Sequence, residues 1–302
     1  MPQMVDTGVV DAPTVILVGS ISGGIGAWIR IVVRDECIAR GVASWKAILS
    51  INLVGSGLAG AALRLPTDPL SLAAISLGFL GGFTTFSSMC LDAVVQWVGL
   101  RRRASALIVA ATMLGGPVIA AIATSVVAVA TVATATIPLV GEPRAGRRRM
   151  VHHFSGVTFI SIGACLGSGI RVSMHLLAPI VGLPVWTATA VVNAVGAGFA
   201  GFVFRWLCAL DIAGAPRHSP NRRLVTERLL IFGFAGGLTT MSALSVEMLV
   251  ATRESWWLGA SIGAINIALG LPATILGWWI ASRLFPSREC FITQDEARVL
   301  SS

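Results

Sequence analysis

Long apolar runs separated by short polar loops dominate the hydrophobic pattern of this 302-residue chain. Eight of these runs contain no charged residue, and each approaches or exceeds the length of about 18–20 residues that crosses a bilayer. They cover residues 12–29, 47–63, 69–90, 104–141, 154–170, 176–204, 229–246 and 255–282. The pattern predicts an all-α integral membrane protein, because lipid offers backbone groups no partner and helices satisfy their own.

The composition supports a membrane location and changes how the charge is interpreted. Hydrophobic residues make up 55% of the chain and charged residues 12%, against about a quarter charged in soluble proteins. The mean hydropathy is +0.83. A net charge of +8 would suit a nucleic-acid partner, but the arginines lie in short loops between apolar runs, where they set membrane topology. We therefore expect a multi-pass protein of the cell membrane. Its partner is expected to be the lipid bilayer, and no nucleic-acid partner is expected.

Neither the N-terminus nor the cysteines point to another class of function. No Lys or Arg precedes the first run, so it does not resemble a signal peptide and is expected to remain as a span. The five cysteines are scattered, without a C-x-x-C pair. The sequence contains no recognisable hydrolytic triad or metal cluster, so we expect no enzymatic activity.

The chain contains the same set of motifs twice. INLVGSGLAG (51–60) returns as VNAVGAGFAG (192–201), and GGIGAWIR (23–30) returns as ACLGSGIR (164–171), both 141 residues later. GFLGGFTTFSS (78–88) returns as GFAGGLTTMSA (233–243), and LGGP (114–117) returns as LGLP (269–272), both 155 residues later. Each half therefore carries four matched spans in the same order, with an insertion of about fourteen residues in the second half.

The positions of Arg and Lys predict that the halves have opposite orientations. In the first half these residues gather after the first and third spans, and in the second half after the second span and at the C-terminal end. The residues are Arg34, Arg40, Lys46, Arg101, Arg102 and Arg103, and then Arg217, Arg222, Arg223, Arg228, Arg283 and Arg288. Positive loops stay in the cytoplasm, so the halves are expected to be inverted. Eight spans with parallel halves are the alternative, which places two arginine-rich loops outside.

Inverted halves require an odd number of crossings before the second half. As one helix, residues 104–141 would extend about 57 Å, nearly twice the hydrocarbon core of about 30 Å. Two spans with a turn near Thr124–Ser125 fit this length. We predict about nine spans: a four-helix repeat in 1–122, an inverting span and basic linker in 123–153, and a second repeat in 154–302. Inverted repeats are a transport architecture.

The third span of each half contains an unusual polar stretch, GGFTTFS (81–87) and GGLTTMS (236–242). A Gly-Gly pair allows a membrane helix to unwind, and the freed carbonyls must then face protein, a cavity or a cation. Two such stretches meeting at the midplane would suit one ion of the size of Na⁺, whereas a kink without a ligand is the alternative. Asn52 and Asn193 lie mid-span, where a buried amide either takes part in the function or joins neighbouring helices by hydrogen bonds.

The combination of GFLGGFTTFSSM, INLVGSGLAG and GGIGAWIRI resembles the CrcB/Fluc fluoride-channel family over four helices of each half. Bacterial members are antiparallel homodimers of a four-span subunit, and eukaryotic exporters fuse two such units through an inverting helix. This chain is similar to the fused arrangement. The resemblance implies a fluoride-selective channel that exports F⁻ passively, lowers cytoplasmic fluoride and works as a single-chain pseudo-dimer.

The resemblance also implies roles for individual residues. A structural Na⁺ that is not transported is implied at the backbone carbonyls of Gly81, Thr84, Gly236 and Thr239. Pore-lining positions fall on Asn52, Asn193, Phe86, Met89, Met241, Leu244, Thr85, Ser87, Thr240 and Ser242. The vestibule arginine falls on Arg30 and Arg171, and a polar position of the last helix falls on Ala111 and Asn266.

The residue chemistry agrees with an anion pathway. Amide and hydroxyl groups donate hydrogen bonds that can replace fluoride's water, and the positive edge of a phenyl ring can face an anion. A fixed Na⁺ would add positive potential. Of the four expected phenylalanines only Phe86 is present, so two pathways need not be equivalent. The alternatives are a secondary transporter of another small ion, disfavoured because Asp92 and Glu247 lie near span ends, and a non-conducting protein of the same fold.

Overall fold

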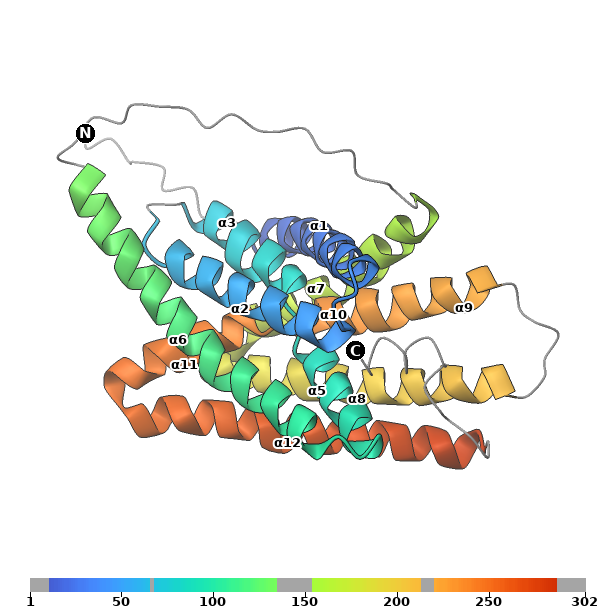
Figure 1. Cartoon of the computed structure of the whole chain (residues 1–302). Helices are drawn as coiled ribbons and strands as arrows, with labels where there is room; N and C mark the ends of the chain where they lie inside the picture. The colour runs from blue at the N-terminus through green and yellow to red at the C-terminus, as the bar shows by residue number, and fades with distance from the viewer. Residues whose placement is uncertain (1–10, 66–67, 135–153, 213–219, 287–302) are drawn as a thin grey trace.

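The computed structural model describes residues 11–65, 68–134, 154–212 and 220–286, and within these ranges the chain is helical, with no strand. The first half contains α1 (Ala12–Ala39), α2 (Ser44–Ala62), α3 (Pro69–Leu72), η1 (Ala73–Leu80), α4 (Gly81–Phe83), α5 (Phe86–Val98) and α6 (Arg102–Thr134). The second contains α7 (Phe154–Ile180), α8 (Val185–Ile212), α9 (Pro220–Glu227), η2 (Arg228–Ala235), α10 (Gly236–Leu238), α11 (Ser242–Glu254) and α12 (Trp256–Leu284). The elements therefore follow the same order in both halves (Figure 1).

Seven helices of the described residues are long and apolar enough to cross a membrane. They cover Ala12–Ala39, Leu70–Val98, Arg102–Ala128, Thr158–Ile180, Val185–Leu210, Arg223–Glu254 and Trp256–Leu284. The helix α2, with 19 residues, is not among these seven. Large apolar side chains such as Leu114 and Trp256 point outward, as expected for a surface in contact with lipid. The fold is that of a multi-pass membrane protein.

The predicted turn near Thr124–Ser125 is wrong, because α6 continues through it to Thr134. The Thr124 hydroxyl donates to the carbonyls of Ala120 and Gly60, and the Ser125 hydroxyl donates to the carbonyl of Ala121. Hydroxyls that bond to the preceding helical turn are satisfied without ending the helix. The rest of the predicted inverting segment, residues 135–153, lies outside the described residues.

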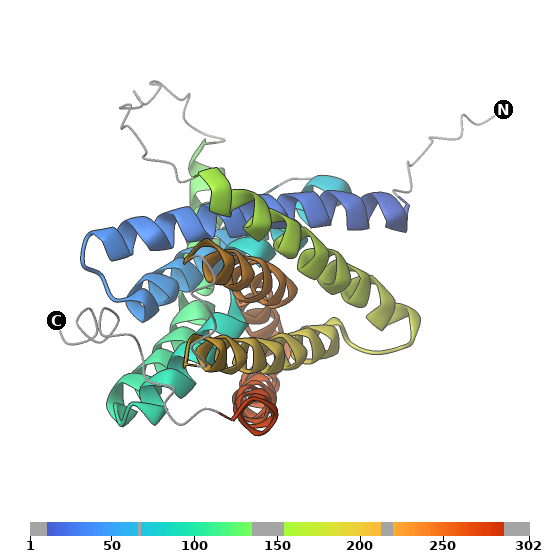
Figure 2. The ribbon, with the colours of Figure 1, turned by 90° about the vertical axis from the view of Figure 1, so that its right-hand side faces the viewer.

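Small residues allow close helix packing between and within the halves. A side chain at Gly19 would meet Val172, and one at Gly24 would meet Cys165, so α1 and α7 pack in antiparallel directions. A side chain at Gly60 would collide with the backbone of Ala120 in α6. Such glycines let membrane helices approach closely. In Figures 1 and 2, α1 and α7 lie on one side of the molecule and α12 on the other, with the broken helices between them.

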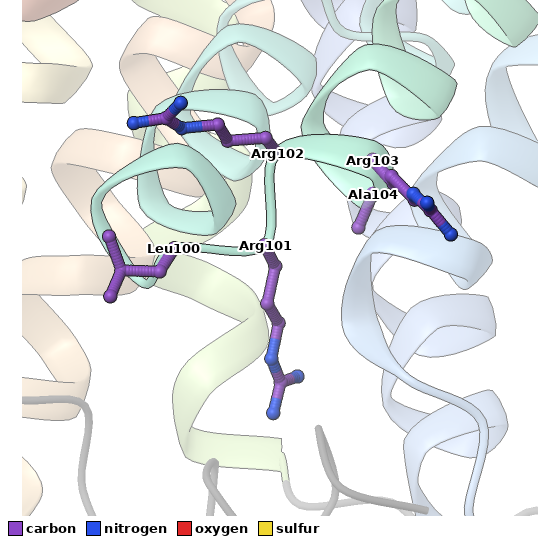
Figure 3. Close-up of a pocket in the computed structure, with 5 residues that line it drawn as sticks. All are labelled: Leu100, Arg101, Arg102, Arg103 and Ala104. Carbon is purple, nitrogen blue, oxygen red and sulfur yellow. The ribbon is translucent and has the colours of Figure 1, made fainter.

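The turn between α5 and α6 carries three consecutive arginines beside a shallow cavity. Leu100, Arg101, Arg102, Arg103 and Ala104 line this cavity. The three arginine side chains point in different directions (Figure 3), and the guanidinium of Arg102 lies 5.2 Å from the centre of the Trp97 ring. These groups do not converge on a common point, so the turn spreads positive charge around the start of α6.

Candidate functional site

Both third spans are interrupted at the expected residues. Helix α4 ends at Phe83 and α10 ends at Leu238, and the next residue in each half, Thr84 or Thr239, is extended (φ −94°, ψ 161° and φ −94°, ψ 156°). A π-helical segment, η1 or η2, precedes each break. Such irregular backbone is tolerated at membrane depth only where protein or a cavity surrounds it, and both threonines are fully buried.

The two asparagines predicted from the sequence bond directly to the broken backbone. Asn52 Oδ1 accepts from the Thr85 amide at 2.9 Å, and Asn52 Nδ2 donates to the Thr85 carbonyl at 3.0 Å. Asn193 makes the same pair of bonds with Thr240, at 2.9 and 3.2 Å. Each asparagine therefore supplies the partners that the interrupted helix lacks, which meets the requirement for satisfied backbone groups.

Hydroxyl groups from both halves meet between the breaks. Thr84 Oγ1 donates to Ser242 Oγ at 3.0 Å, and Thr239 Oγ1 lies 3.0 Å from Ser87 Oγ. The same threonine oxygens accept backbone amides from the opposite half: Ser242 N–H donates to Thr84 and Ser87 N–H donates to Thr239, at 3.0 and 3.1 Å. Reciprocal contacts of this kind are typical of two parts related by a two-fold axis. Thr85 and Thr240 were also predicted as hydroxyl donors. Thr85 Oγ1 lies 3.4 Å from Thr239 Oγ1, and Thr240 Oγ1 lies 3.5 Å from Thr84 Oγ1.

The four positions predicted to hold pore phenylalanines belong to one buried cluster. Phe86, Met89, Met241 and Leu244 are all buried there together with Met113 and Ile262. A side chain at Gly270 of α12 would meet the ring of Phe86, and one at Gly116 of α6 would meet the end of Met241. Phe86 and Met241 therefore each pack against a helix of the opposite half.

The two arginines predicted for a vestibule contact the broken helices. Arg30 and Arg171 are fully buried and bond to carbonyls of the broken helices. Arg30 donates to the carbonyls of Gly82, Thr84 and Gly236 at 2.7, 3.1 and 3.1 Å, and to that of Phe232. Arg171 donates to the carbonyl of Gly237 at 3.0 Å, to Ser168 Oγ at 3.2 Å, and to the carbonyl of Leu77. The unpaired carbonyls of the breaks draw both guanidinium groups inward.

The four carbonyls expected to hold Na⁺ have the chemistry of a cation site. The Thr85 amide donates to Asn52 and the Thr240 amide to Asn193, so neither makes the helical bond to the glycine four residues earlier. Those glycines are Gly81 and Gly236. The carbonyls of Thr84 and Gly236, two of the four, accept the Arg30 guanidinium. Carbonyl oxygens are ligands that hard cations prefer.

Polar residues of the second half surround Asn193, and only some of them were predicted. Asn266, the predicted polar residue of the last helix, accepts from Asn193 Nδ2 at 3.0 Å. His175 Nε2 lies 3.0 Å from Thr189 Oγ1, which donates to Glu247 Oε1 at 2.6 Å. Thr189 lies one helical turn before Asn193, a spacing that would have indicated a shared face. Glu247, expected near a span end, has a largely buried side chain.

This is the site of a multi-pass helical membrane protein whose two halves bring their interrupted third spans together in the interior. A family model described as "CrcB-like protein, Camphor Resistance (CrcB)" matches residues 17–134 and again residues 158–278. The chain belongs to this family and carries its unit twice.

Curated relatives match one unit of the chain at a time. A "Fluoride-specific ion channel FluC" of Hyphomonas neptunium is 34% identical over 134 residues, which cover 43% of this chain and 98% of the relative. Proteins of the same name from Erwinia tasmaniensis and Acinetobacter baumannii are 33% and 35% identical, cover 42% and 40% of this chain, and are themselves covered over 94% and 93%. No solved structure matches the chain.

Proposed function

We propose that this protein is a fluoride-selective ion channel that lets F⁻ leave the cell passively and so lowers cytoplasmic fluoride. The observation that carries the proposal is the double match to a family whose relatives are named fluoride-specific ion channels and are covered almost completely. A passive channel needs no reaction and no coupled ion, because the membrane potential moves a negative ion outward.

The chemistry of the interior supports an anion as the permeating species. Fluoride gives up its hydration shell only where other donors replace water, and the breaks provide Asn amides together with Ser and Thr hydroxyls. We propose the pore-lining roles of Asn52 and Asn193, and of the hydroxyl and apolar positions at and after the breaks. The hydroxyl positions are Thr85, Ser87, Thr240 and Ser242, and the apolar positions are Phe86, Met89, Met241 and Leu244. The buried positive charge of Arg30 and Arg171 favours an anion nearby.

We also propose the inverted arrangement, with repeats in residues 1–122 and 154–302 that act as a single-chain pseudo-dimer. Antiparallel packing of α1 against α7 and the reciprocal threonine–serine contacts support it. If α2 crosses the membrane as α8 does, each half has four spans. Inverted halves then require one further crossing between α6 and α7, for about nine spans in total.

The proposal includes a structural Na⁺ between the halves. The backbone carbonyls of Gly81, Thr84, Gly236 and Thr239 would hold it, because the breaks release them from helical bonds. When bound, this ion would supply a fixed positive charge in a region of low dielectric, where it acts on an anion more strongly than in water. The chain's own part would be to supply these carbonyls from both halves.

The test is fluoride efflux from liposomes that contain the purified protein and KF. Valinomycin starts the efflux by letting K⁺ follow, and a fluoride electrode records it. We expect rapid fluoride efflux and no comparable chloride efflux from matched KCl liposomes. Protein-free liposomes are the control. Folded protein without fluoride efflux would contradict the channel proposal, and equal chloride efflux would contradict its selectivity.

A further inference from the structure

One of the carbonyl pairs proposed for Na⁺ already binds a positive group of the chain. Arg30 Nη1 lies 3.1 Å from the Thr84 carbonyl oxygen and 3.1 Å from the Gly236 carbonyl oxygen, so it bridges the two halves. Both oxygens belong to the proposed sodium site. We infer that the Arg30 guanidinium and Na⁺ compete for one cation site, and that Arg30 is a tethered cation which lowers the affinity for Na⁺. This inference rests on the sodium site of the proposed function.

Electrostatics excludes simultaneous occupancy by both groups at that site. Arg30 and Arg171 are fully buried, and among the ion pairs of the described residues neither has a carboxylate partner. Two buried positive charges already reach the broken helices. A third at the same carbonyls would be repelled strongly, because charges interact far more in a low-dielectric interior than in water. Binding of Na⁺ therefore requires Arg30 to leave the carbonyls of Thr84 and Gly236.

The bonding of Arg30 is incomplete, which makes such a displacement feasible. Its Nε is buried without a hydrogen-bond partner. The corresponding Nε of Arg171 donates to the Gly237 carbonyl at 3.0 Å. A buried donor without a partner is a cost that Arg30 recovers when it moves to a place where Nε is satisfied. Because of this difference, Arg30 competes with Na⁺ for the carbonyls and does not occupy them permanently.

The second half shows why only one arginine occupies the site. Arg171 has Ser168 one turn earlier on α7, and Ser168 Oγ accepts from Arg171 Nη2 at 3.2 Å. The first-half residue 141 positions before Ser168 is Ala27, which has no hydroxyl to offer Arg30. Arg171 donates to Gly237, Leu77 and Ser168, and none of these is a proposed sodium ligand. The Arg171 guanidinium thus lies against Gly81, but Ser168 takes up part of its donor capacity and it donates to none of the four ligand carbonyls.

Two variants with one matched control test the competition. Arg30→Met removes the tethered charge, and Arg171→Met removes the charge that donates to none of the four ligand carbonyls. Ala27→Ser keeps both charges and gives Arg30 the acceptor that Arg171 has. The full-length proteins are purified in Na⁺-free buffer with N-methyl-D-glucamine and titrated with NaCl. Binding is measured by the Na⁺-dependent rise in unfolding temperature and by ²³Na NMR line broadening.

We expect Arg30→Met to bind Na⁺ roughly tenfold or more tightly than the wild type, because removal of a competitor raises the fraction of competent sites. Ala27→Ser should shift the affinity in the same direction, and it answers the question even if Arg30→Met does not fold. Arg171→Met relieves charge repulsion but removes no competitor from the carbonyls, so it should raise the affinity less than Arg30→Met does. Unchanged or weaker Na⁺ binding in Arg30→Met or Ala27→Ser, or an equal gain in Arg171→Met, would overturn the inference. These readouts do not use fluoride, so failure of the efflux test is a separate result.

Discussion

In the first half, Asn52 exchanges two hydrogen bonds with the backbone of Thr85, whereas in the second half Asn193 makes the same two bonds with Thr240 and a third with Asn266. The first-half residue 155 positions before Asn266 is Ala111. The apolar residues that follow the breaks differ as well, because Phe86 of the first half corresponds to Met241 of the second. Backbone contacts are thus repeated, and the side chains around them are not.

This comparison separates two demands on the breaks. The backbone must be satisfied in both halves, because an unpaired amide or carbonyl in a membrane interior is costly. Asparagine meets that demand at both positions. The surrounding side chains contribute packing and donors, which can change in one half without affecting the break in the other. Two pathways built from such halves are expected to differ in conduction.

The largest expected effect comes from replacing each asparagine by aspartate. Asn52→Asp and Asn193→Asp remove the Nδ2 donor and place a carboxylate against a backbone carbonyl, and the second also faces Asn266 Oδ1. We expect each to reduce fluoride efflux by about tenfold or more, because a buried charge without a partner costs several kcal/mol. The two losses should be unequal, and Asn193→Asp should be the more destabilising. Equal losses would indicate two matched pathways.

Removal of the bridging hydroxyls should have an intermediate effect and again distinguish the halves. Thr84 Oγ1 accepts the amides of Met241 and Ser242, whereas Thr239 Oγ1 accepts that of Ser87. Each buried amide without its acceptor costs about 1–3 kcal/mol. Thr84→Val should therefore lower the free energy of unfolding about twice as much as Thr239→Val.

Chemical denaturation in detergent, followed by Trp fluorescence, measures this difference. Serine at position 84 or 239 is the matched control, since Thr84→Ser and Thr239→Ser keep the acceptor oxygen. We expect both serine variants to retain most of the stability. A larger loss from Thr239→Val than from Thr84→Val would contradict the assigned hydrogen bonds.

The smallest expected effect isolates the contribution of Asn266. Asn266→Ala removes one acceptor from Asn193 Nδ2, which keeps its bond to the Thr240 carbonyl. The net cost of one such bond is about 1 kcal/mol. In the Asn266→Ala background, Asn193→Asp and Asn52→Asp should become nearly equal in stability, as a double-mutant cycle would record. A difference that persists would have to come from another neighbour, such as Met241.

Much of the fold follows from the hydrophobic pattern, and the predictions that fail do so for physical reasons. The run 255–282 predicts α12 (Trp256–Leu284) closely. By contrast, the runs that stop at residues 29 and 170 belong to helices that continue to Ala39 and Ile180. The charges of Arg30 and Arg171 end the apolar pattern, but carbonyls of the broken helices accept these guanidinium groups, so the helices continue past them. The predicted turn near Thr124 is wrong for a similar reason, because the Thr124 hydroxyl is satisfied inside α6.

The sequence by itself determined that the chain is a helical membrane protein of two related halves, where its third spans break, and that Asn52 and Asn193 are exceptional. These properties depend on local composition and spacing, which a repeat displays twice. Only the tertiary structure decided which groups meet across the halves: Thr84 with Ser242, Thr239 with Ser87, and Arg30 with the Gly236 carbonyl. Those partners lie more than 140 residues apart, and no local pattern encodes a contact that the packing of distant helices creates.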